Sequence, residues 1–253
     1  MSIVLRALLI LAALMLVAGC AGSGGNGNWG WYVVSPSTSQ GMTNIQFLLG
    51  GLKDTIILSV VSIALAMVLG FLIALPGIAA NRTAQAINVT YVELVRAVPL
   101  LVLILWVYYG LPQVAGMSVS IFLASVLALG ISDSAFQAEI FRAGIQSVQR
   151  GQIEAADAMG LKYGQKMRLI ILPQAIKVIL PPLGNQFVYM LKMSSLASVI
   201  GMQELTRRAN ELVVTEYRPL EIYTFLILEY LVLILIVSAG VRWLERKMQT
   251  EEH

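Results

Sequence analysis

Charged side chains are scarce in this chain of 253 residues. Asp, Glu, Lys and Arg together make up 12% of it, whereas hydrophobic residues make up 58% and the mean hydropathy is +0.79. A soluble domain usually carries about 25% charged residues, with which it covers its surface. The composition therefore excludes an ordinary soluble protein and predicts that lipid covers part of the chain.

Cysteine and histidine are almost absent, since the chain has only Cys20 and His253. One cysteine cannot form a disulfide within the chain, and zinc, haem and iron–sulfur sites need clusters of such ligands. No phosphate-binding glycine loop is present either. We therefore expect no catalytic residues, no metal site and no cofactor in this chain.

A block of basic residues is also missing. The net charge is +3, but Lys and Arg stand singly between apolar runs and beside acidic residues. Nucleic-acid-binding chains usually concentrate their basic residues on one face or in one run. We therefore do not expect a nucleic-acid partner.

The first 20 residues have the pattern of a secretory signal. Arg6 precedes about 12 apolar residues, too few for a span, which needs about 20. Residues 16–20 resemble the lipobox of bacterial lipoproteins, in which cleavage precedes a cysteine that is then acylated. We expect a signal peptide at 1–20, lipidation of Cys20 and an extracytoplasmic tether at 21–46. The alternative is an uncleaved first helix with an incidental cysteine.

Five longer apolar segments follow, at 55–80, 97–111, 118–138, 181–200 and 220–243. With their flanks, each is about 20 residues long, enough for a helix that crosses about 30 Å of hydrocarbon. The segments show no strand-like alternation. The sequence thus predicts an all-α membrane protein whose mature chain has five transmembrane helices, within a domain at 47–247, and a cytoplasmic tail at 248–253.

The distribution of basic residues predicts the orientation. If the tether lies outside, the cytoplasmic segments hold 11 Lys and Arg residues and the outer segments hold 4. Cytoplasmic loops of membrane proteins carry an excess of Lys and Arg. We expect a multi-pass protein of the inner (cytoplasmic) membrane, with the mature N-terminus outside and the C-terminus in the cytoplasm.

The longest cytoplasmic segment, at about 139–180, carries an ordered set of small and apolar residues. Glu154, Ala155 and Ala156 are followed after three residues by Gly160, and after nine more by a stretch that ends in Leu172 and Pro173. This spacing resembles the EAA loop of permease subunits in ABC importers. The loop would form two short helices, with Gly160 in a left-handed turn between them and Pro173 ending the regular hydrogen bonding of the second. The alternative, without a coupling function, is an amphipathic loop that lies on the lipid headgroups.

The resemblance extends over roughly 45–247 and is to the permeases of polar amino acid importers, such as those for histidine, glutamine and arginine. It implies the type I permease fold of ABC importers and a transport subunit that couples to a separate ATPase. The implied partners are a cytosolic ATPase dimer that binds ATP and Mg²⁺, a second permease copy or a sibling, and an extracytoplasmic solute-binding protein. At the end of the fourth apolar segment the chain has Lys192-Met193-Ser194-Ser195, where the family usually has an Asp and a Thr after the Lys.

Ionisable residues inside apolar spans are costly, by about 2.5–3.5 kcal/mol, and they usually mark a water-filled path or a paired contact. We expect Lys192, Ser194, Ser195 and Asp133 to line the translocation path. The alternatives for Lys192 are an ion pair with Asp133 or Glu229, or a side chain that reaches an interface. The alternative for Asp133 is a local role in a helix bend or in packing. Two other functional classes are a secondary transporter, which would need internal repeats, and a membrane enzyme that uses Asp133, Glu139 and Glu229.

Overall fold

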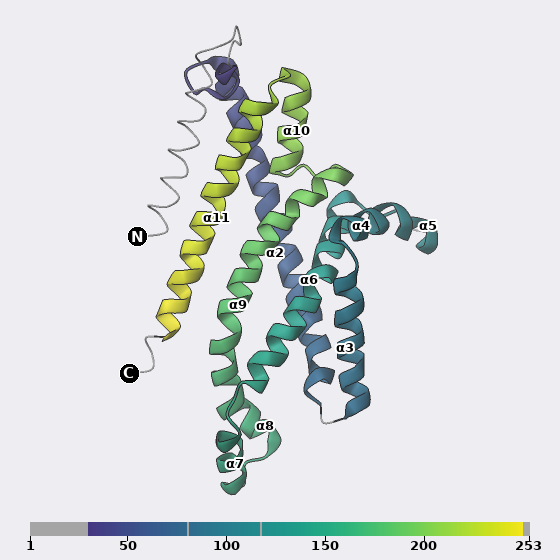
Figure 1. Ribbon diagram of the computed structural model, residues 1–253, viewed down its shortest axis with the longest axis vertical. Helices are drawn as coiled ribbons and strands as arrows, with labels where there is room; N and C mark the ends of the chain where they lie inside the picture. The colour runs from purple at the N-terminus through teal and green to yellow at the C-terminus, as the bar shows by residue number, and fades with distance from the viewer. Residues whose placement is uncertain (1–29, 80, 117, 250–253) are drawn as a thin grey trace.

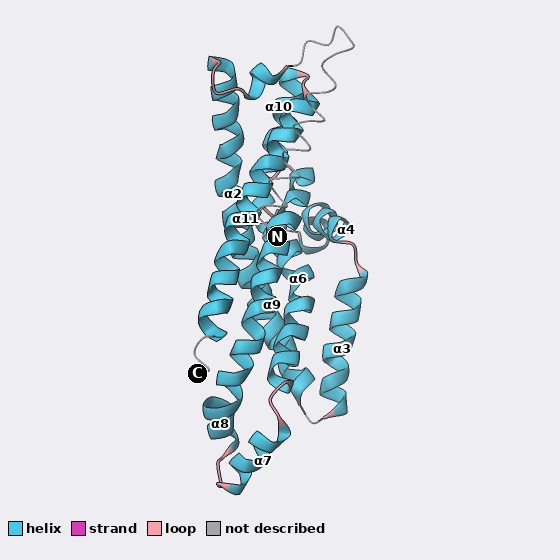
Figure 2. Ribbon diagram, turned by 60° about the vertical axis from the view of Figure 1, so that its left-hand side comes forward, coloured by secondary structure: helices cyan, strands magenta, loops and turns pink. Residues whose placement is uncertain are grey.

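The computed structural model describes residues 30–79, 81–116 and 118–249, and every regular element in these ranges is a helix. Four long helices run roughly along the long axis of the molecule, while α7 and α8 lie at one end and α10 at the other (Figures 1 and 2). The elements are η2 (Trp31–Val34), α2 (Ser39–Ile78), α3 (Arg82–Ala97), α4 (Leu100–Leu105), η3 (Trp106–Gly110), α5 (Leu111–Ala115), α6 (Ile121–Gln146), α7 (Arg150–Ala158), α8 (Tyr163–Lys166), η4 (Met167–Ile171), α9 (Leu172–Met193), η5 (Ser194–Ile200), α10 (Leu205–Glu216) and α11 (Pro219–Gln249).

Four helical stretches are long and apolar enough to cross a membrane: Ser39–Ile78, Ile121–Gln146, Tyr163–Ile200 and Pro219–Lys247. They coincide with four of the five apolar segments of the sequence. The fifth candidate is a pair of helices, Arg82–Ala97 and Leu100–Ala115, which meet at an angle of 90°. The structure is therefore all-helical in the described residues, with four candidate membrane spans, or five if the bent pair counts as one.

The second predicted span, at 97–111, differs from our expectation because it is not part of one straight helix. The chain is extended at Val98 (φ −87°, ψ 123°) and at Pro99 (φ −60°, ψ 130°). Proline disfavours the helical conformation of the residue before it and has no N–H to continue the ladder. The apolar run therefore bends at Pro99, and α4, η3 and α5 lie across the top of α3 (Figure 1).

The expected tether at 21–46 is folded in the part that the structure describes. The Thr38 side chain accepts a hydrogen bond from the N–H of Gly41 at 3.1 Å and so caps the start of α2. Asn44 donates to the carbonyl of Val33 at 3.0 Å, which fixes η2 against α2. Residues from 31 onward are thus part of the helical domain. The predicted signal peptide and Cys20 lie outside the described residues.

The centre of the molecule is the contact between α2 and α6, which small residues bring close together. A Cβ on Gly70 would lie 2.4 Å from the Cβ of Gln137, so only glycine fits at this crossing. Ala66, Ala135 and Ala138 are fully buried in the same region. This close packing holds α6 in the middle of the bundle and fixes the polar residues that it carries.

Candidate functional site

The loop with the EAA spacing forms a compact hairpin of short helices, which we call the knuckle (residues 150–171). Its first arm is α7, and its second arm is α8 with the π-helical turn η4. Gly160 has φ +72°, and the N–H groups of Gly160 and Leu161 donate to the carbonyls of Asp157 (2.9 Å) and Ala156 (3.1 Å). These are the two bonds of a Schellman motif. The left-handed turn predicted at Gly160 is therefore confirmed.

Two contacts close the arms of the knuckle on each other. The ammonium group of Lys166 on α8 lies 2.6 Å from the Asp157 carboxylate on α7. Ala156 is fully buried between the arms, whereas Glu154 and Ala155 are exposed. Only Ala156 is thus buried, because the side chains of adjacent residues point about 100° apart around the axis of a helix. Glu154 and Ala155 remain available to another molecule.

Pro173 differs from our expectation, since helical structure runs past it. The helical stretch continues from Tyr163 to Ile200, and Pro173 occupies the second position of α9. Just before it, the N–H of Leu172 donates to the carbonyl of Met167, which is the i to i−5 pattern of a π turn. One extra residue in that turn makes room for a proline ring that would otherwise collide with the carbonyl four residues back. Leu172 is half-buried and Pro173 is exposed.

Asp133 lies in the middle of α6 and is only 4% exposed. Its carboxylate accepts hydrogen bonds from Gln137 on the same helix (2.8 Å) and from Gln186 on α9. It also borders a cavity of about 20 Å³, which has room for about one water molecule. The two amides were not among our candidate site residues; a glutamine four residues after Asp133 on one helix face was the available signal.

The other predicted path residues lie at the C-terminal end of α9 and in η5. Lys192 is exposed on the surface of the single chain. The Ser194 hydroxyl donates to the carbonyl of Leu191 at 2.8 Å, and that of Ser195 to the carbonyl of Lys192 at 2.7 Å. Both serines therefore bond to their own helix, where α9 tightens into the 3-10 helix η5.

Lys192 does not form the ion pair that we considered as an alternative. Asp133 is occupied by the two glutamine amides, and neither carboxylate oxygen of Glu229 has a hydrogen-bond partner among the described residues. Glu139 pairs with Arg96 at 2.5 Å, so Asp133, Glu139 and Glu229 differ in their partners and share no hydrogen bond among the described residues.

A groove of about 360 Å³ runs along the same face of α6 and α9, lined among others by Phe136, Glu139, Pro182 and Gln186. Gln186 joins this groove to Asp133, because its amide donates to that carboxylate. The guanidinium group of Arg96 lies 4.6 Å from the centre of the Phe136 ring and pairs with Glu139. A row of polar groups therefore leads from the buried Asp133 towards the knuckle end of the bundle.

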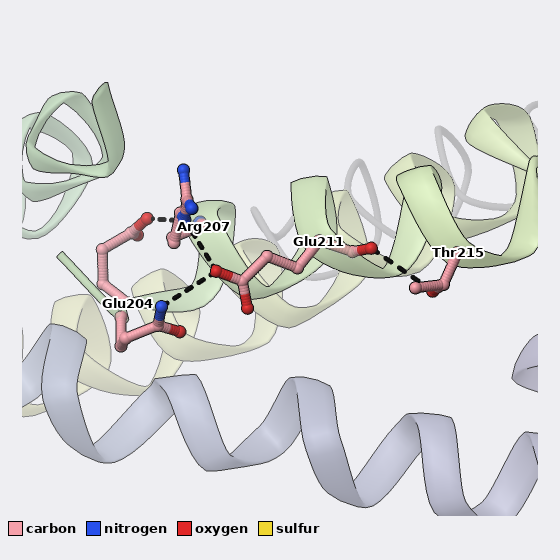
Figure 3. A network of polar contacts seen from close by, with 5 residues as sticks. Glu204, Arg207, Glu211 and Thr215 are labelled. Atoms are coloured by element: carbon pink, nitrogen blue, oxygen red, sulfur yellow. Dashed lines mark hydrogen bonds and ion pairs between the residues drawn. The ribbon is translucent and has the colours of Figure 1, made fainter. Parts of the chain in front are cut away.

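At the opposite end, α10 carries its own polar network (Figure 3). The Glu204 carboxylate caps α10, accepting from the N–H of Arg207 (2.7 Å) and from the hydroxyl of Tyr230 on α11 (2.8 Å). Burial raises the pKa of Glu204 above its ordinary value of 4.5, although these hydrogen bonds oppose the shift. Half-buried Glu211 accepts from Gln203 (2.9 Å) and pairs with Arg207 (2.7 Å), and these contacts lower its pKa. The network fastens α10 to α11.

The structure thus combines a bundle of long apolar helices, a groove beside the buried Asp133 and a projecting knuckle. The family of binding-protein-dependent transport system inner membrane components matches residues 66–250. The chain therefore belongs to this family, whose members are permease subunits of ABC importers and are not themselves catalytic.

Its relatives include amino acid permeases. The chain is 41% identical to the probable glutamine ABC transporter permease protein GlnM of Bacillus subtilis, over 81% of this chain and 95% of that protein. It is 36% identical to the arginine transport system permease protein ArtQ of the same organism, over 82% and 95%.

Solved structures share the fold. An amino acid ABC transporter crystallised with histidines has a TM-score of 0.76 and 40% identity, over 81% of this chain and 96% of that one. The MetNI methionine ABC transporter has a TM-score of 0.72 at 19% identity, over 83% and 99%, which indicates a shared fold alone. The predicted resemblance to permeases of polar amino acid importers is thereby confirmed, as is a multi-pass membrane protein with the type I permease fold.

Proposed function

We propose that this chain forms the translocation path of an ATP-driven importer for a polar amino acid, and that it couples to a separate ATPase through the knuckle. The observation that carries the proposal is the knuckle itself, with its complete EAA spacing and its left-handed turn at Gly160. The substrate class rests on relatives named for glutamine and arginine. A polar amino acid of either kind fits the proposal.

Coupling needs a rigid contact, because the ATPase must move the membrane helices when it binds and hydrolyses ATP. The knuckle meets this need, since its arms are joined by the Asp157–Lys166 pair and its second arm continues into α9. Glu154, Ala155, Ala156, Gly160, Leu172 and Pro173 form or support this contact in our proposal. ATP and Mg²⁺ would be bound by the partner, and this chain would hold no cofactor.

The path would run along α6 and α9, past Asp133, Lys192, Ser194 and Ser195. Lys192 supports this choice, because an exposed ammonium group at membrane depth is costly in lipid and needs water or another protein surface. A second copy of the chain, or a sibling, would close this face by pairing about a two-fold axis. Two knuckles would then engage the two halves of an ATPase dimer.

The two ends of the molecule would face different compartments. We propose that the end with α10 lies outside, where it meets the solute-binding protein, and that the knuckle and the C-terminus lie in the cytoplasm, as the 11 basic residues on that side favour. Cleavage before Cys20 and its acylation are part of the same proposal. Mass spectrometry of the mature protein decides this point: an intact segment 1–19 would contradict it.

The test of the central proposal is Gly160→Val. Apart from its chain neighbours, no described residue has an atom within 4 Å of a Cβ at Gly160. The substitution therefore acts through the backbone, where a left-handed conformation costs a branched residue about 1–2 kcal/mol. We expect normal membrane insertion with loss of ATPase association and of amino acid uptake, measured by pull-down and transport at matched expression.

The matched control for this test is Gly151→Val. Gly151 also has open space around its Cβ, but it lies inside α7 and has no positive φ. We expect this variant to retain association and uptake. If Gly160→Val behaved like its control, the knuckle would not be the coupling element.

A further inference from the structure

A second groove, of about 250 Å³, lies where α2, α9 and α11 meet (Figure 1). It is lined among others by Met67 on α2, Gly184 on α9 and Val241 on α11, and Glu245 is its one ionisable lining residue. A Cβ on Gly184 would lie 2.4 Å from Cγ1 of Val241, so the glycine lets α9 and α11 close together beside the groove. We call this apolar cleft the back groove.

The back groove lies on a different side of α9 from the proposed path. Leu183 and Phe187 line it, whereas Pro182 and Gln186 line the groove that leads from Asp133. Adjacent residues of a helix point about 100° apart, so the two grooves use different stripes of α9. Because the path would use the Asp133 side, lipid is the medium that reaches the back groove.

One end of the back groove lies at the depth of lipid headgroups. Leu244 and Glu245, which line that end, belong to the last turn of the span Pro219–Lys247. Next to them Trp243 is 60% exposed, and the ammonium group of Lys247 lies 5.6 Å from the centre of its ring. Exposed tryptophan and basic side chains at the end of a span are typical of the membrane interface.

Two opposite charges at this end have no partner in the described part of the chain. Glu245 is half-buried, and its carboxylate neither accepts a hydrogen bond nor forms an ion pair there. Arg242 is also half-buried, and only its main-chain carbonyl is used, by Arg246 at 3.2 Å. Side chains three residues apart are neighbours on a helix, yet Arg242 and Glu245 do not pair with each other. Both remain available to a ligand that carries an anionic and a cationic group.

We propose that the back groove binds a phospholipid with a primary ammonium headgroup, such as phosphatidylethanolamine. An acyl chain lies against the apolar lining, the phosphate accepts from Arg242, and the ammonium group donates to Glu245. The order fits, because an ethanolamine linker places the ammonium beyond the phosphate and Glu245 lies about 4.5 Å nearer the end of the span than Arg242. The inference requires a chain in a membrane but not the coupling role of the knuckle.

The headgroup is tested by native mass spectrometry of the purified importer, which counts the lipids that it retains. The detergent contains equal amounts of phosphatidylethanolamine and phosphatidylcholine with identical acyl chains. The choline group is fully methylated and cannot donate a hydrogen bond to Glu245. We expect about fivefold more phosphatidylethanolamine than phosphatidylcholine, because a charge-assisted hydrogen bond is made only by the first.

Glu245→Met keeps the length of the side chain but removes its oxygens, so the preference for phosphatidylethanolamine should disappear. The matched control is Glu93→Met, which removes an exposed carboxylate on α3 and should leave the preference unchanged. Arg242→Gln should lower the retention of both lipids alike, since both carry the phosphate.

The acyl-chain part of the proposal is tested with Met67→Trp, whose larger ring fills the groove. Met67 is 36% exposed and lines the groove, so this variant should retain less of both lipids. Its control is Val68→Trp, at the next position of α2, which is 59% exposed but does not line the groove. This control should retain lipid like wild type.

Three results would overturn the inference. If Met67→Trp retains as much lipid as Val68→Trp, the retained lipid lies elsewhere. If Glu245→Met keeps the preference for phosphatidylethanolamine, Glu245 does not bind the ammonium group. If either variant instead separates two permease copies in the mass spectrum, the back groove is an interface between subunits. None of these outcomes involves Gly160, so the proposed function is judged independently by Gly160→Val.

Discussion

Two buried carboxylates of this protein, those of Asp133 and Glu204, have different hydrogen-bond partners. Asp133 is satisfied by two neutral amides, and Glu204 by a tyrosine hydroxyl and a helix N-terminus. Neither carboxylate has a cation as its partner among the described residues. A buried carboxylate that is only hydrogen-bonded still bears the cost of desolvation, and this makes its protonation sensitive to its surroundings.

Glu204 leads to a prediction about pH. Because burial raises its folded pKa above 4.5, the folded state binds this proton more tightly than the unfolded state. Its contribution to the free energy of unfolding is therefore fullest below pH 4.5 and is lost as the pH rises through the raised value. Glu204→Gln keeps the shape and stays neutral, so wild type should lose stability relative to this variant as the pH rises above 4.5.

The measurement is the difference in melting temperature between the two proteins in detergent, at steps from pH 4.5 upwards. Glu211 has a lowered pKa, so its stabilising effect is lost only as the pH falls below 4.5. Titration of Glu211 therefore does not affect the melting temperatures measured from pH 4.5 upwards. Equal pH profiles for wild type and Glu204→Gln would show that Glu204 does not titrate differently on folding.

At the scale of the elements, the sequence was informative where one local rule decided the structure. The apolar lengths predicted the four long spans, and the Gly160 turn followed from the lack of a side chain. The sequence did not predict the bend at Pro99 or the continuation of the helix past Pro173. A proline marks a possible break, but neighbouring turns and packing decide whether the helix stops, bends or inserts a π turn.

The candidate site depends even more on contacts that no local sequence pattern predicts. Asp133 was predicted from its cost in an apolar span, and the structure places it in a buried polar cluster. Its partner Gln186 lies 53 positions later in the chain. No local pattern pairs residues so far apart, since the register between α6 and α9 is set by the packing of whole helices.

The bent pair gives a prediction of distance. A straight helix from Thr83 to Val114 would span about 46 Å, whereas two legs at a right angle bring the ends to about 33 Å apart. Both residues are exposed, so Thr83→Cys and Val114→Cys can carry spin labels in a Cys20→Ser background. Electron–electron resonance should give the shorter distance, and Pro99→Ala should broaden it towards longer values. A single distance near 46 Å in the protein with Pro99 would contradict the bend.

The whole molecule has a long, narrow form with a different task proposed for each end. Helix α2 has 40 residues and is about 60 Å long, twice the hydrocarbon thickness. Its first turns therefore extend beyond the bilayer and pack with α10 and η2. With the knuckle at the far end, the molecule can touch partners on both sides of a membrane while its middle remains in lipid.

In the middle of the molecule, some exposed side chains face lipid and others would face the translocation path. Two exposed positions test which side chains do which. Lys192 on α9 and Val232 on α11 are both exposed in the single chain. Lipid suits the valine, whereas the ammonium group needs water. In a Cys20→Ser background, Lys192→Cys should react with a hydrophilic, membrane-impermeant thiol reagent once the importer is assembled, and Val232→Cys should not. Bound substrate should slow the first reaction, because a thiol ionises and reacts only where water reaches it. If both cysteines were equally unreactive, Lys192 would lie against lipid or another helix, and α9 would have to leave the proposed path.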